Sequence, residues 1–437
     1  WLELVYEEVR EDVKGTFLEK AKIIPVSSKT KEGLETLIEE IDTLTEEIEP
    51  KDTHLSPRLP VDRVFSLAGF GTIVTGTLIS GTLEEGNRIM VYPKKKEYRI
   101  RSIQVHDNKV AHGEAGQRVA INIPGVKPGE IDRGDVIALP DTMEPTMMFD
   151  AKLKLLQTAE RNINNRDRLR IYHGSAEVFG RVVLLDREEL EIGEETFVQI
   201  RLEEEIACQK DDPFVIRFYS PMITIGGGII LDPNPPKRKR FREEVIKELE
   251  IKEKGSEEEI IEQYLLNTAS YPSMETITKA AGNLSIDKCK TILYELEERN
   301  IIKAFNTKDE AFYTHASHLD KLINKIKIIL SDFHKKNPLK PGMSKEELKS
   351  RTMKDIRQKV QEDIFAYLEK EKSIKLENQY VSLHEFEVEF NEEQNNIRNS
   401  ILNIYENNKF NPPRYEEVSE QLKYPRKTIS QVYDAMI

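Results

Sequence analysis

Two oppositely charged residues stand side by side early in the chain, and they are the first side chains that could hold a charged ligand. Residues 59–67 alternate apolar and polar side chains like a β-strand, and Asp62 and Arg63 form its charged pair. Because neighbouring strand residues point to opposite faces of a sheet, only one of the two can lie on the solvated face; the other must face the interior or a rim and needs a partner. A further cation, Arg118, precedes the apolar run 119–123, where an arginine is usually only an exposed rim charge.

A loop rich in hydroxyl side chains is a second candidate site. Residues 21–41 predict an apolar strand, a loop that holds Ser27, Ser28 and Lys29, and a helix that begins near Lys31. Backbone amides of such a loop can contact a carbonyl oxygen of a ligand, but serine at this place more often only caps the helix. The residues of the loop leave both interpretations open.

Other stretches that could bind phosphate have simpler interpretations. The sequence KKKEYRIR at 94–101 has five basic residues in eight, and a solvated hairpin is favoured over a contact with RNA phosphates. The triple glycine at 226–228 lies between β-branched residues, which indicates a bulge where backbones pack closely. No G-x-x-x-x-G-K-[ST] phosphate loop occurs in the sequence, so we expect no GTP binding and no GTPase activity of this chain.

Composition limits the class of protein. The 437 residues carry a net charge of −13, which argues against wholesale wrapping of nucleic acid and leaves only local basic patches for RNA. Length suggests about three domains. Cys208 and Cys289 have no metal-ligand spacing and are interpreted as buried thiols in a reducing compartment. Because no apolar run approaches the roughly 18 residues of a membrane helix and no signal-like segment opens the chain, we expect a cytoplasmic protein with no membrane partner.

The elements that position these residues are mainly short strands. Residues 59–140 have strands and turns at the spacing of an all-β barrel, and Gly69, Gly71 and Gly76 mark bulges or a sharp corner of a closed barrel. Residues 146–233 repeat the pattern and predict a second barrel.

Helical periodicity replaces the strands after a run of four basic residues at 237–240. One unit of a helix, a short helix, a longer helix and two short strands occurs twice, and a third copy has helices only, which predicts winged-helix repeats. In the third copy we expect Val432, Tyr433 and Met436 to be partly uncovered, and residues from about 409 onward to be mobile. The predicted helices span 2–11, 256–267, 273–281, 285–299, 318–336, 344–351, 355–371, 392–408, 414–422 and 425–437.

Three stretches resemble one known family. VDRVFSLAGFGTIVTGT at 61–77, HGSAEVFGRV at 173–182 and TIGGGIILD at 224–232 are similar to the second and third domains of translational GTPases, and the first is similar to the bacterial-type selenocysteine-specific translation elongation factor. The resemblance implies a multidomain fragment: the remnant of an α/β GTPase domain, two β-barrel domains and winged-helix repeats (α+β). The implied domains are the GTPase remnant at 1–50, the two β-barrels at 51–145 and 146–236, two winged helices at 237–315 and 316–385, and a truncated third winged helix at 386–437.

The resemblance also implies a function, which is GTP-dependent delivery of selenocysteinyl-tRNA to the ribosome at recoded UGA codons. Positions that match Asp62, Arg63 and Arg118 line the family's pocket for the aminoacyl group, while Ser27, Ser28 and Lys29 match its guanine-recognition loop. In the intact protein the cofactors would be GTP and magnesium. The resemblance predicts no catalytic residue, metal ligand or cofactor for this chain.

The implied partners are selenocysteinyl-tRNA, the ribosome and, through a C-terminal module missing here, the selenocysteine-insertion hairpin of the messenger RNA; the protein would be a monomer. The arginines of the second barrel fit a tRNA backbone and a solvated strand face equally well; they are Arg161, Arg166, Arg168 and Arg170. Two alternatives stay open: a non-enzymatic winged-helix regulator that binds nucleic acid, and another translational GTPase such as an elongation factor Tu relative.

Overall fold

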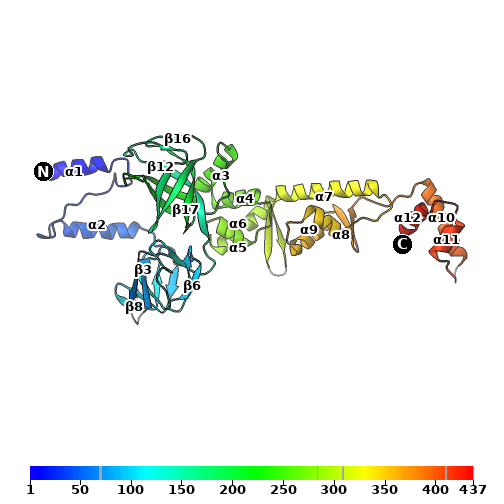
Figure 1. The fold of residues 1–437 in the computed structure, drawn as a ribbon, viewed down its shortest axis with the longest axis horizontal. Helices are drawn as coiled ribbons and strands as arrows, with labels where there is room; N and C mark the ends of the chain where they lie inside the picture. Colours follow the sequence, from blue (N-terminus) through cyan, green and yellow to red (C-terminus); the bar gives the residue numbers. More distant parts are fainter. Residues whose placement is uncertain (68–70, 283, 308–309, 409–410, 437) are drawn as a thin grey trace. The chain divides into compact units, whose positions relative to one another are not determined.

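The structure is a computed structural model that describes residues 1–437 except 68–70, 283, 308–309, 409–410 and 437. Its contacts divide the chain into two compact units, 1–142 and 143–437. The first unit holds two helices and a barrel domain, and the second holds another barrel domain followed by helical modules (Figure 1). Among the described residues, every helix is too short or too polar to span a lipid bilayer.

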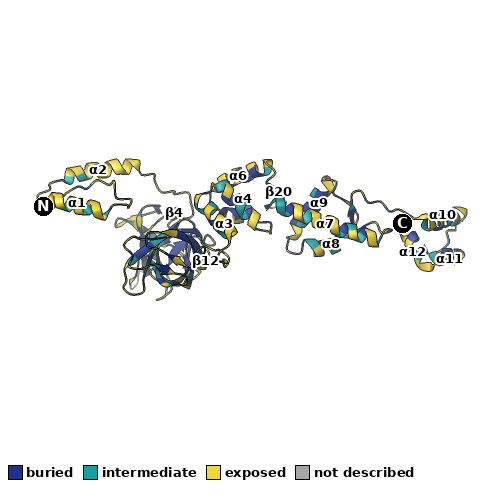
Figure 2. Ribbon diagram, turned by 90° about the horizontal axis from the view of Figure 1, so that it is seen from above, coloured by how far each residue is buried: buried dark blue, intermediate teal, exposed yellow. Residues whose placement is uncertain are grey.

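The two N-terminal helices, α1 (Leu2–Asp12) and α2 (Leu34–Glu47), bury none of their side chains, as Figure 2 shows by colour. Helix α1 confirms the predicted N-terminal helix. The strand predicted within 21–41 is wrong, because no neighbouring strand in the described chain hydrogen-bonds to this extended segment. Helix α2 begins at Leu34 instead of near Lys31, since Gly33 before it has a left-handed φ of 74°.

The first barrel domain surrounds one apolar core, in which Leu59, Val74 and Ile121 are fully buried. Its described strands form a four-stranded sheet (β1-β11-β5-β6), a five-stranded sheet (β2-β3-β10-β7-β8) and the pair β4-β9. Hydrogen bonds between these described strands do not close into one ring, unlike in the closed barrel that was predicted. The strands are β1 (Arg58–Pro60), β2 (Arg63–Leu67), β3 (Gly71–Thr77), β4 (Thr82–Glu84), β5 (Arg88–Tyr92), β6 (Lys96–Arg99), β7 (Ser102–Val105), β8 (Asn108–Val110), β9 (His112–Glu114), β10 (Arg118–Ile123) and β11 (Val136–Ala138).

Glycine at position 76 allows two strands of this domain to approach closely. A Cβ atom at Gly76 would lie 2.1 Å from the carbonyl oxygen of Pro60, so no larger residue fits without moving β1 or β3. Gly71 has a φ of 95°, which also favours glycine. Both agree with the predicted close approach, whereas Gly69 lies outside the described residues.

The second barrel domain is a closed barrel with the order β12-β17-β15-β14-β18-β19, and it confirms the predicted barrel. Cβ atoms at 226–228 would lie 1.8–2.5 Å from main-chain oxygens of the adjacent strands, which confirms that close packing requires the triple glycine. The strands are β12 (Pro145–Leu155), β13 (Ile163–Asn164), β14 (Arg168–His173), β15 (Ala176–Leu184), β16 (Glu189–Leu190), β17 (Glu195–Ala207), β18 (Pro213–Arg217) and β19 (Thr224–Asp232), with β13 and β16 paired apart from the barrel.

Helix α3 (Glu243–Lys254), which the sequence analysis did not predict, follows the second barrel. Its Leu249 is fully buried in a small cluster with Val183, Phe197 and Leu231 of the barrel. This contact joins the helical part of the chain to the barrel.

Winged-helix order recurs in the next two modules, close to the predicted ranges. The first module consists of α4 (Glu257–Asn267), α5 (Met274–Ala280), α6 (Ile286–Glu298), β20 (Ile302–Asn306) and β21 (Ala311–His315). The second consists of α7 (Ala316–Lys336), β22 (Met343–Ser344), α8 (Lys345–Thr352), α9 (Gln358–Lys370), β23 (Ile374–Glu377) and β24 (Tyr380–Leu383).

The third module consists of α10 (Glu392–Asn407), α11 (Tyr415–Gln421) and α12 (Arg426–Asp434). The expectation that Val432 is partly uncovered is wrong, because this side chain is fully buried with Ile397, Val418 and Ile429. Leu339, from the segment before β22, also packs into this cluster. It covers apolar side chains of the third module, which was expected to lack the two strands of a wing. Tyr433 and Met436 are only partly buried against it, as predicted.

Candidate binding site on the first barrel

The pairing of β2 and β10 with β3 places Arg63 and Arg118 on one face of a sheet. Arg63 lies opposite Thr75 of β3 on one side, and Arg118 lies opposite Thr77 on the other. Thr75 and Thr77 are two residues apart on β3 and share a face, whereas the adjacent Val74 is buried in the core on the other face. Both arginines therefore lie on the outer face, with their Cα atoms roughly 12 Å apart as estimated from strand spacing and rise.

Asp62 joins this site through Arg118. Its carboxylate accepts a hydrogen bond from Nη1 of Arg118 at 2.7 Å, and its backbone N–H donates to the carbonyl of Thr75 at 2.8 Å. The side chains of Asp62 and Arg118 are 37% and 52% exposed, so this ion pair contributes only about 0–1 kcal/mol to stability. We infer that its main effect is to orient the Arg118 guanidinium.

The strand expected over 59–67 is interrupted, so its alternation does not decide where Asp62 and Arg63 point. Val61 and Asp62 form a link between β1 and β2, and β2 begins only at Arg63. Val61 is fully buried, whereas Asp62 is partly exposed and Arg63 exposed. Strand alternation does not apply across the link, so both charged side chains are accessible to a ligand.

The sequence analysis missed Phe65, which lies two residues after Arg63 on β2 and hence on the same face. Its side chain is 47% exposed, and its partner on β3 is Ile73. An exposed aromatic residue beside two arginines gives the face an apolar surface for the body of a ligand. The alternate spacing of Arg63 and Phe65 was the signal that could have identified it.

This arrangement can bind a ligand, and it shows no catalytic group. Two guanidiniums favour an anionic or strongly polarisable group, because their charge does not change at physiological pH. In the described part of the chain Arg63 carries no ion pair, so its charge is available to a ligand. No cluster of three or more metal-ligating side chains occurs among the residues that the structure describes.

The loop with Ser27, Ser28 and Lys29 forms a turn closed by its own hydrogen bonds. The N–H of Ser27 donates to the carbonyl of Glu32 at 3.0 Å, and its Oγ accepts from the N–H of Thr30 at 3.2 Å. The amide of Ser27 is therefore not available to a ligand, while Ser28 and Lys29 are exposed. Within the described contacts, nothing connects this turn to Asp62, Arg63 or Arg118.

The basic hairpin at 94–101 is largely neutralised. Nζ of Lys94 donates to Asp132 at 2.8 Å and to Asp135 at 2.7 Å, and Lys96 forms an ion pair with Glu130 at 3.0 Å. Burial acts to lower the pKa of Lys94, but the two aspartates outweigh it and raise that pKa. These contacts support the structural interpretation over an RNA contact.

The arginines of the second barrel are also engaged in part. Nε and Nη2 of Arg168 donate to the carboxylate of Glu203 at 2.8 and 2.7 Å, and Arg170 pairs with Glu177. Both guanidiniums also lie over the ring of Phe179. This pairing leaves less free charge for a phosphate backbone than the sequence suggested.

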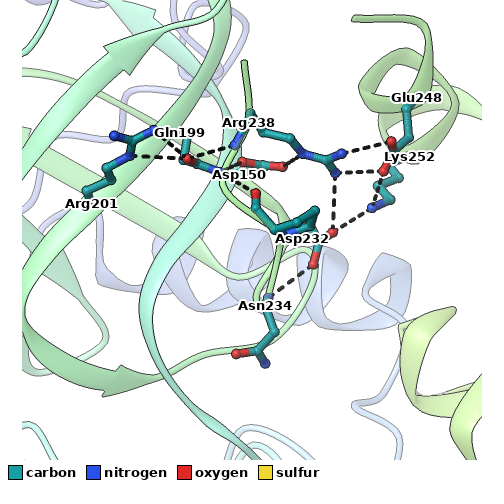
Figure 3. A network of polar contacts seen from close by, with 9 residues as sticks. Asp150, Gln199, Arg201, Asp232, Asn234, Arg238, Glu248 and Lys252 are labelled. Carbon is teal, nitrogen blue, oxygen red and sulfur yellow. Dashed lines mark hydrogen bonds and ion pairs between the residues drawn. The ribbon is translucent and has the colours of Figure 1, made fainter. Parts of the chain in front are cut away.

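Within the run at 237–240, the side chain of Arg238 reaches from Asp150 to Glu248, as Figure 3 shows. Its side chain is 8% exposed, and its Nε donates to Asp150, which is fully buried, at 2.8 Å. Its two Nη atoms donate to the Glu248 carboxylate on α3 at 2.9 and 2.6 Å. Lys252 of α3 completes the network with ion pairs to Asp232 at 2.6 Å and Glu248 at 2.9 Å.

Burial and pairing shift the pKa values of this network in opposite directions. Burial raises the pKa of Asp150 to about 6, although Arg238 opposes the shift. For Glu248, burial acts to raise the pKa, but Arg238 and Lys252 outweigh it and lower that pKa. The network therefore holds α3 on the second barrel, and the sequence analysis missed it because basic runs are usually exposed.

The class of protein follows from family models that match the first barrel, the second barrel and the second winged-helix module. "Elongation factor Tu domain 2" matches residues 71–138, "Selenocysteine-specific elongation factor, beta-barrel domain" matches 150–237, and "Elongation factor SelB, winged helix" matches 329–383. Two consecutive barrels of this kind followed by winged helices define a translation elongation factor.

Individual relatives narrow the class. The selenocysteine-specific elongation factor of Desulfomicrobium baculatum is 30% identical over 436 residues, which cover 99% of this chain and 68% of that protein. That of Haemophilus influenzae is 25% identical, covering 93% of this chain and 62% of that protein. The chain belongs to the family of selenocysteine-specific elongation factors. A crystal structure of the bacterial selenocysteine-specific elongation factor EF-Sec has a similar fold, with a TM-score of 0.65 at 19% sequence identity. The matched region includes 100% of this chain and 76% of the EF-Sec chain.

Proposed function

We propose that this chain forms the tRNA-binding body and part of the winged-helix arm of a factor that delivers selenocysteinyl-tRNA to the ribosome at recoded UGA codons. The observation that supports the proposal is the common outer face of Asp62, Arg63 and Arg118 on the first barrel. The aminoacyl group would lie on this face, with Arg63 and Arg118 beside its side chain. Phe65 would contact the rest of the aminoacyl end.

Charge explains the selectivity of such a face. A selenol is largely ionised at neutral pH, whereas the hydroxyl of serine is neutral, so two guanidiniums stabilise the selenolate far more. Asp62 keeps Arg118 in place but also offsets part of its charge. Arg63, which has no ion pair among the described residues, supplies the larger uncompensated attraction.

In the intact protein we expect GTP and magnesium to gate delivery, as in translational GTPases. The residues present here do not form that site. The sequence has no phosphate loop, the Ser27 amide is bonded within its own turn, and no metal-ligand cluster occurs in the part of the chain that the structure describes. Accordingly, no step of nucleotide chemistry is assigned to these residues.

The partners are selenocysteinyl-tRNA, the ribosome and, through a further C-terminal module, the selenocysteine-insertion hairpin. We propose that the factor acts as a cytoplasmic monomer.

The experiment measures how well the full-length protein protects selenocysteinyl-tRNA and seryl-tRNA from hydrolysis. Arg63→Ala and Arg118→Ala should each weaken the selenocysteinyl form roughly ten- to a hundredfold, the loss of one charge-assisted contact of about 1.5–3 kcal/mol, and barely change the seryl form. Arg88→Ala is the matched control, because Arg88 is a 73% exposed arginine of the same barrel, on β5. Equal losses for both tRNAs would show that the arginines only bind the tRNA backbone.

A further inference from the structure

In the second winged-helix module, the helix that such modules usually present to nucleic acid is covered by the first module. Tyr367 of α9 packs edge-on against Phe305 of β20 with ring centroids 6.1 Å apart. Arg357, immediately before α9, lies over the ring of Phe312 of β21 at 4.9 Å. Phe305 and Phe312 belong to the hydrophobic core of the second module, so the contact is part of the fold. A groove of nucleic acid cannot reach this part of α9.

Two basic residues near α9 are also neutralised. Glu362 of α9 accepts ion pairs from Lys345 at 2.6 Å and from Lys349 at 2.7 Å. Both lysines lie on α8, the helix before α9. These two lysines therefore add little free positive charge to the recognition side of this module.

Helix α7 carries a large share of the positive charge of the second module. It contains five lysines and two aspartates, although the whole chain has a net charge of −13. All five lysines are exposed, and within the described residues none of them forms an ion pair; they are Lys321, Lys325, Lys327, Lys335 and Lys336. At about 100° per residue, Lys321, Lys325, Lys335 and Lys336 share one side of the helix, and Lys327 lies on the adjacent side. This α7 stripe of four lysines is about 21 Å long from Lys321 to Lys335 at 1.5 Å per residue.

Next to this stripe is a pocket of about 680 Å³, formed by α7, the turn before β23 and the segment after β24. Lys327, Lys335 and Lys372 line it, together with the hydroxyl groups of Ser331 and Ser373. Asp332 and Glu385 line it as well, so three lysines against two carboxylates leave a net charge of +1.

His334, one of the residues that line this pocket, has a buried ring nitrogen without a hydrogen-bond partner among the described atoms. His334 is 6% exposed and stacks on Phe386 with ring centroids 3.6 Å apart. Its Nε2 accepts from the N–H of Leu383 at 3.2 Å, and burial lowers its pKa, so the neutral ring carries its proton on Nδ1. Nδ1 is buried and has no hydrogen-bond partner among the described atoms. An oxygen acceptor would satisfy it.

We propose that this pocket and the α7 stripe bind successive phosphates of an RNA strand, so that the second module contacts RNA through α7 and its wing instead of through α9. The choice of RNA rests on the proposed function. The lysine, serine and histidine donors themselves would accept any ligand with negatively charged oxygen atoms. A lone anion would need the pocket alone. A stripe about 21 Å long beside it fits a polymer that carries a phosphate at each nucleotide.

The test measures by fluorescence anisotropy how the 437-residue chain binds a fluorescein-labelled single-stranded RNA of about 20 nucleotides. The variant Lys327→Gln/Lys335→Gln/Lys372→Gln should bind at least tenfold more weakly at low salt. For this variant, the slope of log K against log salt concentration should be smaller in magnitude by about 2. Each of the three lost phosphate contacts lowers this slope by about 0.7 for a single strand. The matched control changes three exposed lysines outside the module, Lys237→Gln/Lys239→Gln/Lys290→Gln, and should keep both affinity and slope.

Equal losses in the two triple variants would overturn the proposal, because net charge alone would then explain the binding. Displacement of the RNA by polyglutamate as effectively as by unlabelled RNA would overturn the choice of RNA. The pocket variant should leave selenocysteinyl-tRNA protection by the full-length protein unchanged, so failure here can be distinguished from failure of the aminoacyl site.

Discussion

Replacing Arg238 tests whether the buried ion-pair network fixes α3 to the second barrel. Arg238→Met keeps most of the apolar stem but removes the guanidinium from three carboxylates. Among the described side chains, Asp150, which is fully buried, would then keep only its hydrogen bond from Gln199 at 2.9 Å. Removal of one partner of a buried ion pair typically costs about 3–5 kcal/mol, because the other charge stays desolvated.

The readout is amide hydrogen exchange, because unfolding of a chain with several domains is not two-state. A loss of about 3 kcal/mol in local stability accelerates exchange roughly 150-fold, and we expect this in α3 but not in the first barrel. Lys237→Ala and Lys239→Ala are the matched controls, since these neighbours are exposed and should change stability by less than about 0.5 kcal/mol.

A double variant separates the charge from the packing. Asp150→Asn/Arg238→Met removes the orphaned carboxylate together with the guanidinium, so exchange in α3 should be slower than in Arg238→Met alone. If Arg238→Met changes α3 no more than the lysine controls do, or if the double variant shows the sum of two separate losses, the network does not hold the helix.

Three further predictions follow from single features. Because burial raises the pKa of Asp150 to about 6, above the roughly 3.9 of an unfolded chain, the folded state binds this proton first; its contribution to stability should rise by about 2 kcal/mol from pH 7 to 4.5, and this contribution should be absent in Asp150→Asn. Gly228→Ala should destabilise the second barrel by about 1–3 kcal/mol, as measured by amide hydrogen exchange of its strands, since its Cβ would lie 1.8 Å from the carbonyl oxygen of Lys152. Titration of a fluorescent guanine nucleotide should show no saturable binding to this chain, and micromolar saturation would contradict the absence of a phosphate loop.

Local periodicity predicted the winged-helix modules well, because their helices are amphipathic and bounded by caps. Ser256, for example, forms a capping box with Glu259, and the predicted and observed starts of this helix differ by one residue. The strand predicted within 21–41 failed for the opposite reason: apolar composition is local, but a strand needs a partner elsewhere.

The candidate sites were less predictable, because their geometry depends on distant residues. Asp62 and Arg118 are 56 positions apart, and only the pairing of both flanking strands with β3 brings them together. The same applies to Arg238, whose partner Asp150 lies 88 positions earlier on β12. Composition near 237–240 predicts an exposed patch, because nothing local reveals the carboxylates.

The two arginine–aspartate pairs show why one can serve binding and the other cannot. Arg238 and Asp150 are desolvated together, so separating them exposes a buried charge to an apolar surrounding, at a cost of several kcal/mol. Arg118 and Asp62 are both more than one-third exposed, and water can replace either partner at a cost of about 0–1 kcal/mol. A ligand anion can therefore draw the Arg118 guanidinium toward itself at little cost, while Arg238 stays committed to the fold. Exposure of the ion pair, more than its length of 2.7 Å, is the reason that we propose the first barrel as the binding place of a charged aminoacyl group.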